Sequence, residues 1–182
     1  MSALWRKPPF LIAGALLAFV IFVQLRPGRY RTVRTVEVAA TPEALYRRIE
    51  DLRQWQRWSP WNELDPQVKR KYEGPRRGIG ATYSWEGTGA IGQGKVTILE
   101  AEEPLQVVYR VEFIAPWHAT VQQSFLISKA ASGSRLTWAI AGERRFWSKL
   151  FGLFSDADEV LGADMERGLA MLKQLVERPA SS

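Results

Sequence analysis

Few residues of this chain have the type and spacing that chemistry requires. The segment Gly87-Thr-Gly89-Ala-Ile-Gly92 spells the dinucleotide-binding pattern, which works where the glycines lead into a helix N-terminus. Residues 93–100 alternate as a strand does, so we interpret these glycines as turn residues. His118 begins another predicted strand without a serine or aspartate in a triad-like context, so we interpret it as an ordinary polar residue.

Composition excludes several kinds of site. The chain has no cysteine and one histidine, which excludes disulfides, thiolate metal sites, a cysteine nucleophile and any site that needs two imidazoles. Asp156 and Asp158 lie two residues apart on a predicted helix, where their side chains diverge by about 200° and cannot chelate one ion. We therefore expect no catalytic motif, no metal and no cofactor.

Asp158 occupies an unusual position among the acidic residues. It follows Phe154 by four residues and precedes Leu161 by three, which places it on the apolar stripe of the predicted helix, facing the sheet. A carboxylate is costly to bury unless a base or hydrogen-bond donors meet it. Two interpretations stay open: a structural ion pair with a basic residue near the sheet, or a polar anchor at the floor of a ligand pocket.

Aromatic residues gather on one side of the predicted sheet. Alternation along the strands directs Tyr83, Trp85, Tyr109, Phe113 and Trp138 to the same face. Such rings either fill a core or line a cavity for a mainly apolar ligand. In the cavity interpretation, the expected lining residues are Trp58, Trp61, Tyr83, Trp85, Tyr109, Phe113, Trp138, Phe151, Phe154, Asp158 and Met165.

The elements that must position these residues follow a clear order. Residues 35–40 alternate as a half-buried strand, Thr41 and Pro42 begin a helix, and a second short helical piece covers 52–58. Period-two patterning predicts further strands at 68–73, 81–86, 92–100, 106–115, 119–128 and 135–142. A long helix runs from about Phe146 to Val176. The pattern predicts an α+β fold, in which an antiparallel sheet with one buried face packs against the last helix.

The N-terminus predicts membrane attachment. Residues 8–25 carry no charge and, as a helix, would extend about 27 Å, enough for a thin hydrocarbon core. Trp5 and Tyr30 flank this run, and no Ala-x-Ala-like cleavage site follows it. We therefore expect a single uncleaved transmembrane helix, within an anchor and basic flank at 1–30, a domain at 31–178 and a tail at 179–182. The count of positive charges on its two sides favours a cytoplasmic domain.

The positive charge belongs to the N-terminus. Residues 1–34 hold six of the 25 basic residues and no acidic one, which leaves 19 basic and 19 acidic residues in the remainder. Nucleic-acid binding requires a concentrated basic face. We therefore expect no nucleic-acid partner.

The order of strand, two short helices, six strands and long helix resembles the START-like helix-grip superfamily, in particular its SRPBCC or polyketide cyclase/dehydrase subgroup. The segments that carry the likeness are VEVAATPEAL at 36–45, DLRQW at 51–55, WSPW at 58–61, YSWEG at 83–87, GLF at 152–154 with Asp158, and GL and LK at 168–173. The resemblance covers residues 33–176. It implies a curved sheet wrapped around the C-terminal helix, with a cavity between them for lipids, sterols, polyketides or other hydrophobic molecules.

Three functions follow as hypotheses. The leading one is a membrane-tethered domain that binds a hydrophobic small molecule or lipid, with the membrane as its other partner. The second is a cyclase or dehydratase that uses Asp158 or Glu86 with Tyr83 or Tyr109 as acid and base. The third is a module that docks a protein partner, and it requires an exposed row of rings at Trp55, Trp58 and Trp61.

The segment that joins the last strand to the long helix carries an additional hypothesis. Residues 144–154 hold more apolar side chains than one inward stripe can accommodate, with Arg144, Arg145 and Lys149 beside them. Basic residues next to exposed rings favour an anionic lipid surface. The segment is therefore either ordinary packing or a mobile gate near the bilayer.

Overall fold

The computed structural model describes residues 28–88, 91–143 and 157–178, together with the isolated positions 14, 17, 18, 21, 22 and 25. The chain divides into two compact units, residues 1–30 with 143–156, and residues 31–142 with 157–182. The second unit holds almost all of the described residues. The predicted segment 8–25 and the predicted gate at 144–154 lie largely or wholly outside the described residues. Within the described part of the chain, no helix is both long and apolar enough to cross a bilayer.

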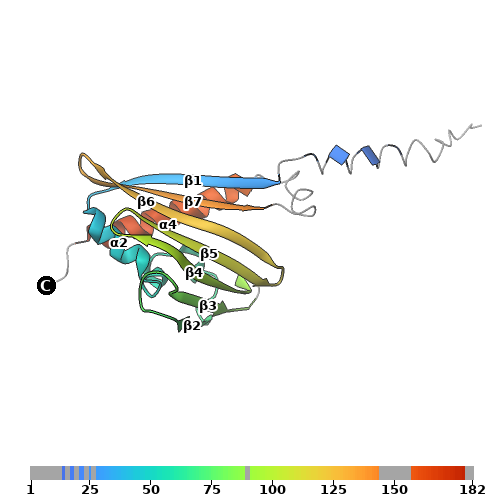
Figure 1. Ribbon diagram of the computed structural model, residues 1–182, viewed down its shortest axis with the longest axis horizontal. Coiled ribbons are helices and arrows are strands. Elements are labelled where there is room, and N and C mark those ends of the chain that lie inside the picture. Colours follow the sequence, from blue (N-terminus) through green and yellow to red (C-terminus); the bar gives the residue numbers. More distant parts are fainter. Residues whose placement is uncertain are drawn as a thin grey trace, which may run out of the picture. The chain divides into compact units, whose positions relative to one another are not determined.

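The described elements follow the predicted order (Figure 1). In chain order they are strand β1 (Arg29–Val38), helix α2 (Pro42–Glu50), the short 3-10 helices η1 (Gln54–Arg57) and η2 (Pro60–Glu63), strands β2 (Lys69–Glu73), β3 (Thr82–Glu86), β4 (Gln93–Glu102), β5 (Gln106–Ala115), β6 (Ala119–Ala130) and β7 (Gly133–Glu143), and helix α4 (Ala157–Glu177). The first part of the predicted long helix, residues 146–156, lies outside the described residues.

The strands form one seven-stranded sheet in the order β1-β7-β6-β5-β4-β3-β2. Each pair from β2 to β7 is antiparallel. Thr35 contacts Thr137 and Glu37 contacts Arg135 across the β1–β7 pair, which is the antiparallel sense as well. The predicted antiparallel sheet with a C-terminal helix is therefore confirmed.

Helix α2 begins as its sequence predicts. Thr41 has extended backbone angles, and its hydroxyl accepts a hydrogen bond of 3.3 Å from the Ala44 amide. Such a cap satisfies one of the free amides at the start of a helix. Pro42 follows in the first turn, where its missing N–H costs nothing. The helix buries Leu45 and Ile49 against the sheet.

Helix α4 covers the inner face of the sheet, the face that Tyr109 and Trp138 share. Met165, Leu169 and Leu172 of α4 are buried in one cluster with those two rings. Gly168 allows the approach, because a Cβ at this position would lie 2.9 Å from Cδ of Pro60 and 3.0 Å from the Trp138 ring. The core thus lies between the sheet on one side and α4 with the 3-10 helices on the other.

An ion-pair network joins β1 to the first turns of α4. The Arg34 guanidinium donates to Oε1 of Glu166 at 2.7 Å and lies 3.4 Å from Oδ2 of Asp158. It passes over Gly162, where any larger residue would collide with it. β1 is therefore attached to α4 by charge as well as to β7 by backbone hydrogen bonds.

Candidate functional site

The centre of the inner face is filled by aromatic rings that pack on one another. Phe125 stacks on Trp138 with centroids 4.9 Å apart, and Trp58 meets both rings edge-on. Tyr109 contacts Trp55 edge-on at 5.0 Å. Four of the predicted lining residues, Trp58, Tyr109, Trp138 and Met165, are almost completely buried in this group. In this part of the fold the rings form a packed core.

A second aromatic group lies toward the edge of the same face. Tyr72 stacks on Tyr83 with centroids 5.3 Å apart, and the row continues through Trp85 to Phe113. Trp85 and Phe113 are only half-buried, as is Trp61, which contacts Trp138 from the side of η2. We call these half-buried members of the predicted lining, Trp61, Trp85 and Phe113, the aromatic wall. Part of each ring is exposed to solvent. Phe151 and Phe154 lie outside the described residues.

Most of the inward N–H and O–H groups of these rings have acceptors. Tyr109 donates to the Ile49 carbonyl at 2.8 Å, and the Trp55 indole donates to the same oxygen at 2.9 Å. Trp138 donates to Gln123 at 3.1 Å, and Trp85 donates to the Ile91 carbonyl at 3.0 Å. The Trp61 indole donates to Asp164 at 3.3 Å. The core is thus largely satisfied in its hydrogen bonds.

Trp58 is the exception in this aromatic core. Its side chain is 1% exposed, and its indole N–H finds no acceptor among the described residues. Leaving a buried donor unsatisfied costs about 1–3 kcal/mol. Trp58 is therefore a buried donor whose hydrogen bond the described part of the domain does not itself satisfy.

Arg70 adds a cation to the inner face. It lies opposite Trp85 in the β2–β3 ladder, so its side chain leaves the sheet on the same face as that ring. Its guanidinium makes two long hydrogen bonds of 3.3 Å, to the Val68 carbonyl and to Asn62, while its Nε is buried without a partner among the described residues. Burial raises the pKa of the neighbouring Tyr83 phenol, and Arg70 opposes that rise. The Arg70 guanidinium, beside the Tyr83 hydroxyl, can donate to an anionic or acceptor-rich group of a ligand.

Asp158 does not lie at the floor of a pocket. Its side chain is 52% exposed and pairs with Arg34, so the structural ion pair is the interpretation that the structure supports. A hydrogen bond from Thr32, together with Arg34, lowers the pKa of its carboxyl group. The structure does not support the expectation of an inward carboxylate, because Asp158 lies in the first described turn of α4, where its side chain meets Arg34 and water.

The acid–base groups of the enzyme hypothesis do not form a site. Glu86 is exposed at the end of β3, and Asp158 belongs to the network with Arg34. The Tyr109 hydroxyl is engaged with the Ile49 carbonyl. The docking hypothesis loses its basis as well, because Trp55 and Trp58 are 5% and 1% exposed.

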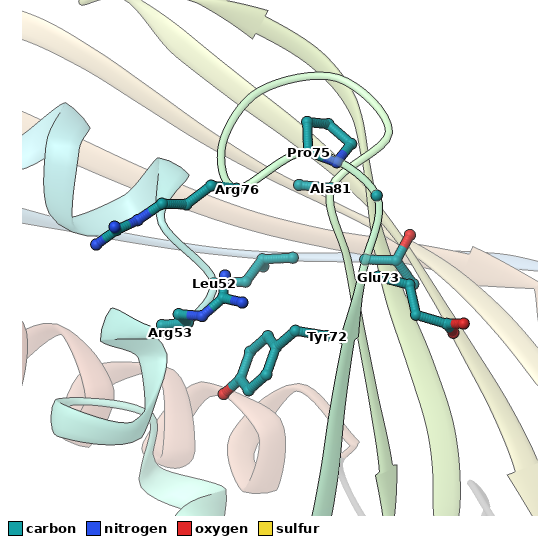
Figure 2. A pocket seen from close by; sticks show the side chains of 9 residues that line it. Leu52, Arg53, Tyr72, Glu73, Pro75, Arg76 and Ala81 are labelled. Carbon is teal, nitrogen blue, oxygen red and sulfur yellow. The ribbon is translucent and has the colours of Figure 1, made fainter.

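A small pocket opens beside the β2–β3 loop (Figure 2). Its empty volume is about 210 Å³ with the opening to solvent included, and the space enclosed within it is about that of a single water molecule. Figure 2 shows the Arg53 guanidinium beside the Tyr72 ring, at 4.6 Å from its centroid, whereas Glu73 points to the other side of the strand. Within the described residues, no group of acidic or histidine side chains could hold a metal ion. The aromatic wall with Trp58 and Arg70 is thus the better candidate site.

Two buried tyrosines predict the response of the fold to alkaline pH. Burial raises the pKa of Tyr46 to about 12 and that of Tyr109 well above 10.0. The unfolded chain releases these two phenol protons near pH 10, whereas the folded chain retains them to higher pH. The contribution of the two tyrosines to the free energy of unfolding is therefore fully present below pH 10 and is lost as the pH rises toward 12. For Tyr46 the loss is on the order of 2–3 kcal/mol. Urea unfolding should show a shallower alkaline decline in Tyr46→Phe, and an unchanged slope would contradict this assignment.

The chain matches a known protein family. The family described as "Polyketide cyclase / dehydrase and lipid transport" matches residues 29–177. This range includes all the strands and helix α4. No curated protein matches the chain significantly.

Solved structures share the fold at low sequence identity. A protein of Chromobacterium violaceum is 16% identical with a TM-score of 0.57, and the match covers 84% of this chain and 100% of that one. The di-domain ARO/CYC StfQ from the steffimycin biosynthetic pathway is 12% identical with a TM-score of 0.60, covering 97% of this chain and 63% of that one. The Aha1 dimer from Colwellia psychrerythraea is 14% identical with a TM-score of 0.58, covering 81% of this chain and 96% of that one. Identities this low show the fold alone.

Proposed function

Because this chain belongs to the polyketide cyclase/dehydrase and lipid transport family, we propose that it binds a hydrophobic small molecule or lipid between the inner face of the sheet and α4. The observation that carries the proposal is the buried Trp58 indole, which lacks an acceptor among the described residues. An apolar core gains nothing from such a donor, whereas a ligand oxygen would satisfy it. On this proposal the chain is a binding protein.

The polarity of the site defines the ligand further. Three buried side-chain atoms lack a hydrogen-bond partner among the described residues, and two of them are donors: the indole N–H of Trp58 and the Nε–H of Arg70. The third, Oδ2 of Asp51, lies 3.7 Å from Nε of Arg77. Trp85, which lies opposite Arg70 in the β2–β3 ladder, and its neighbour Phe113 supply half-buried apolar contact area. A mainly apolar molecule with carbonyl or carboxylate oxygens meets both requirements, as a polyketide or a fatty acid does.

The proposal includes a membrane location. On this proposal, the uncharged residues 8–25 would span the membrane and the basic residues that follow would lie near the headgroups. A hydrophobic ligand would then enter the domain from a lipid phase, in which it is concentrated. The cytoplasmic side is favoured by the distribution of basic residues around the helix.

Two matched tryptophan variants test the binding function. In Trp58→Phe the ligand loses its donor, so affinity for dansylaminoundecanoic acid should fall about 5- to 10-fold. In Trp55→Phe, which removes a paired indole from the same core, affinity should stay near that of the wild type. Probe emission is titrated with the full chain in a zwitterionic detergent, and the signal of empty micelles is subtracted.

Stability provides the second measurement of the same pair. Both variants lose the same ring atoms, but Trp55→Phe also loses a hydrogen bond to the Ile49 carbonyl. Trp58→Phe should therefore be less destabilised, by about 1 kcal/mol in urea unfolding. Equal losses of affinity in the two variants, or no binding of the probe by the wild type, would refute the proposed function.

A further inference from the structure

The turn between β5 and β6 presents an apolar surface to solvent. Trp117 is 70% exposed in this turn, and Ile114 at the end of β5 is 47% exposed. The other described tryptophans are buried or half-buried in the domain. An exposed ring of this size offers a large apolar contact area to a second apolar phase.

The β5–β6 turn packs against the residues that precede β4. Gly92, before β4, has a φ of +56° and lies against the Ala115 carbonyl, where any Cβ would collide. The β5–β6 ladder continues to the pair Phe113 and Ala119, directly next to the turn. Trp117 is thus presented by a tight hairpin with a defined position in the fold.

Strand pairing places this turn at a particular end of the sheet. The β1–β7 contacts Thr35–Thr137 and Glu37–Arg135 set a register in which Arg31 lies opposite Ala141. Ala141 pairs with Gln122, close to the start of β6. The point where the chain enters the domain and the β5–β6 turn therefore lie at the same end of the sheet (Figure 1). The β2–β3 loop with Ile79 lies at the opposite end.

Chain length restricts how far this end can be from a membrane. Five residues separate Leu25, the end of the proposed transmembrane helix, from Arg31, and the six Cα–Cα steps between the two residues reach about 20 Å when fully extended. We propose that this end of the sheet docks on the bilayer and that Trp117 inserts into its headgroup region. Tryptophan is enriched at that depth, and Arg26, Arg29 and Arg31 in and beside the connecting segment favour anionic lipids. The inference rests on the membrane segment of the proposed function.

Docking also gives the candidate site a direct route to lipid. Phe113 and Trp85 of the aromatic wall lie at this same end, since both are opposite Gly94 near the start of β4. The half-buried end of the wall would therefore face the membrane. A ligand could pass between bilayer and wall with little exposure to water.

The chain has no cysteine, so single labelling sites can be introduced cleanly. His118→Cys carries a nitrobenzoxadiazole label next to Trp117, and Ile79→Cys carries the same label on another exposed position, at the opposite end. Each full-length protein is placed in vesicles of phosphatidylcholine with a minor share of phosphatidylglycerol, and lipid-borne nitroxides report contact with the bilayer. We expect the label at 118 to lose most of its emission and the label at 79 to keep it.

A second substitution identifies the ring responsible. Adding Trp117→Ser to His118→Cys should restore most of the emission, because the turn then loses its apolar contact with lipid. Equal quenching at 118 and 79, or quenching that survives Trp117→Ser, overturns the docking proposal while the chain stays with the vesicles. If the protein does not co-float with vesicles in a density gradient, both the proposed transmembrane segment and the proposed docking of Trp117 are wrong. Binding of the dansyl probe in detergent is measured independently of either result.

Discussion

Replacing Trp138 with alanine should cost about 3–5 kcal/mol of folding free energy. The ring is 0% exposed, stacks on Phe125, contacts Trp58 and Trp61, and lies against Gly168 of α4. Truncation removes these contacts, leaves a cavity, and deprives the buried Gln123 of the indole that donates to it. Since domains of this kind have about 5–15 kcal/mol of stability, the variant should be largely unfolded at moderate urea concentrations.

The matched control for this variant is Trp61→Ala. Trp61 contacts the same ring from η2 but is half-buried, so part of its surface is already in contact with water. We expect it to lose less than half as much stability, measured by urea unfolding monitored by circular dichroism. If Trp138→Ala costs no more than Trp61→Ala, the ring borders an open cavity and the core is not filled at this point.

Alternation alone was sufficient to predict the central strands. Strand β5 has the predicted bounds, 106–115, because Val107, Tyr109 and Val111 face the core and Arg110 and Glu112 alternate with them over its second half. Strand β1 begins six residues before its predicted start at 35. Its first half alternates arginines with Tyr30 and Thr32, and only pairing with β7 makes such a polar segment a strand.

The sequence was sufficient to predict the aromatic residues of the candidate site but not its polar groups. The sequence places Tyr83, Trp85 and Phe113 on one face because each lies in an alternating strand. Arg70 was missed, since the strand KRKYE is almost wholly polar and only its register opposite Trp85 directs Arg70 inward. No local pattern shows that the Trp58 indole lacks an acceptor, because that depends on packing between distant elements.

Asp158 shows the limit of helical periodicity. Spacing from Leu161 and Met165 places it on the apolar side of α4, and this assignment of the side is consistent with its contact to Arg34 in the sheet. Periodicity gives direction around a helix but not the distance from the core along its axis. Asp158 lies in the first turn of the described helix, where the same side of α4 meets the rim of the sheet and water.

Arg70→Met should lower affinity for dansylaminoundecanoic acid by about 10-fold or more, because a hydrogen bond to a charged group contributes about 1.5–3 kcal/mol. Affinity for the corresponding dansylamino alcohol should change little, since it carries no charge for the guanidinium to bind. Lys71→Met is the matched control, because Lys71 is the next residue of β2, lies on the other face and pairs with Glu73 in solvent. Comparable losses for acid and alcohol, or an equal effect of Lys71→Met, would show that Arg70 supports the fold and does not bind the ligand. Loss confined to the acid in Arg70→Met would place the carboxylate of the ligand at the inner face of β2.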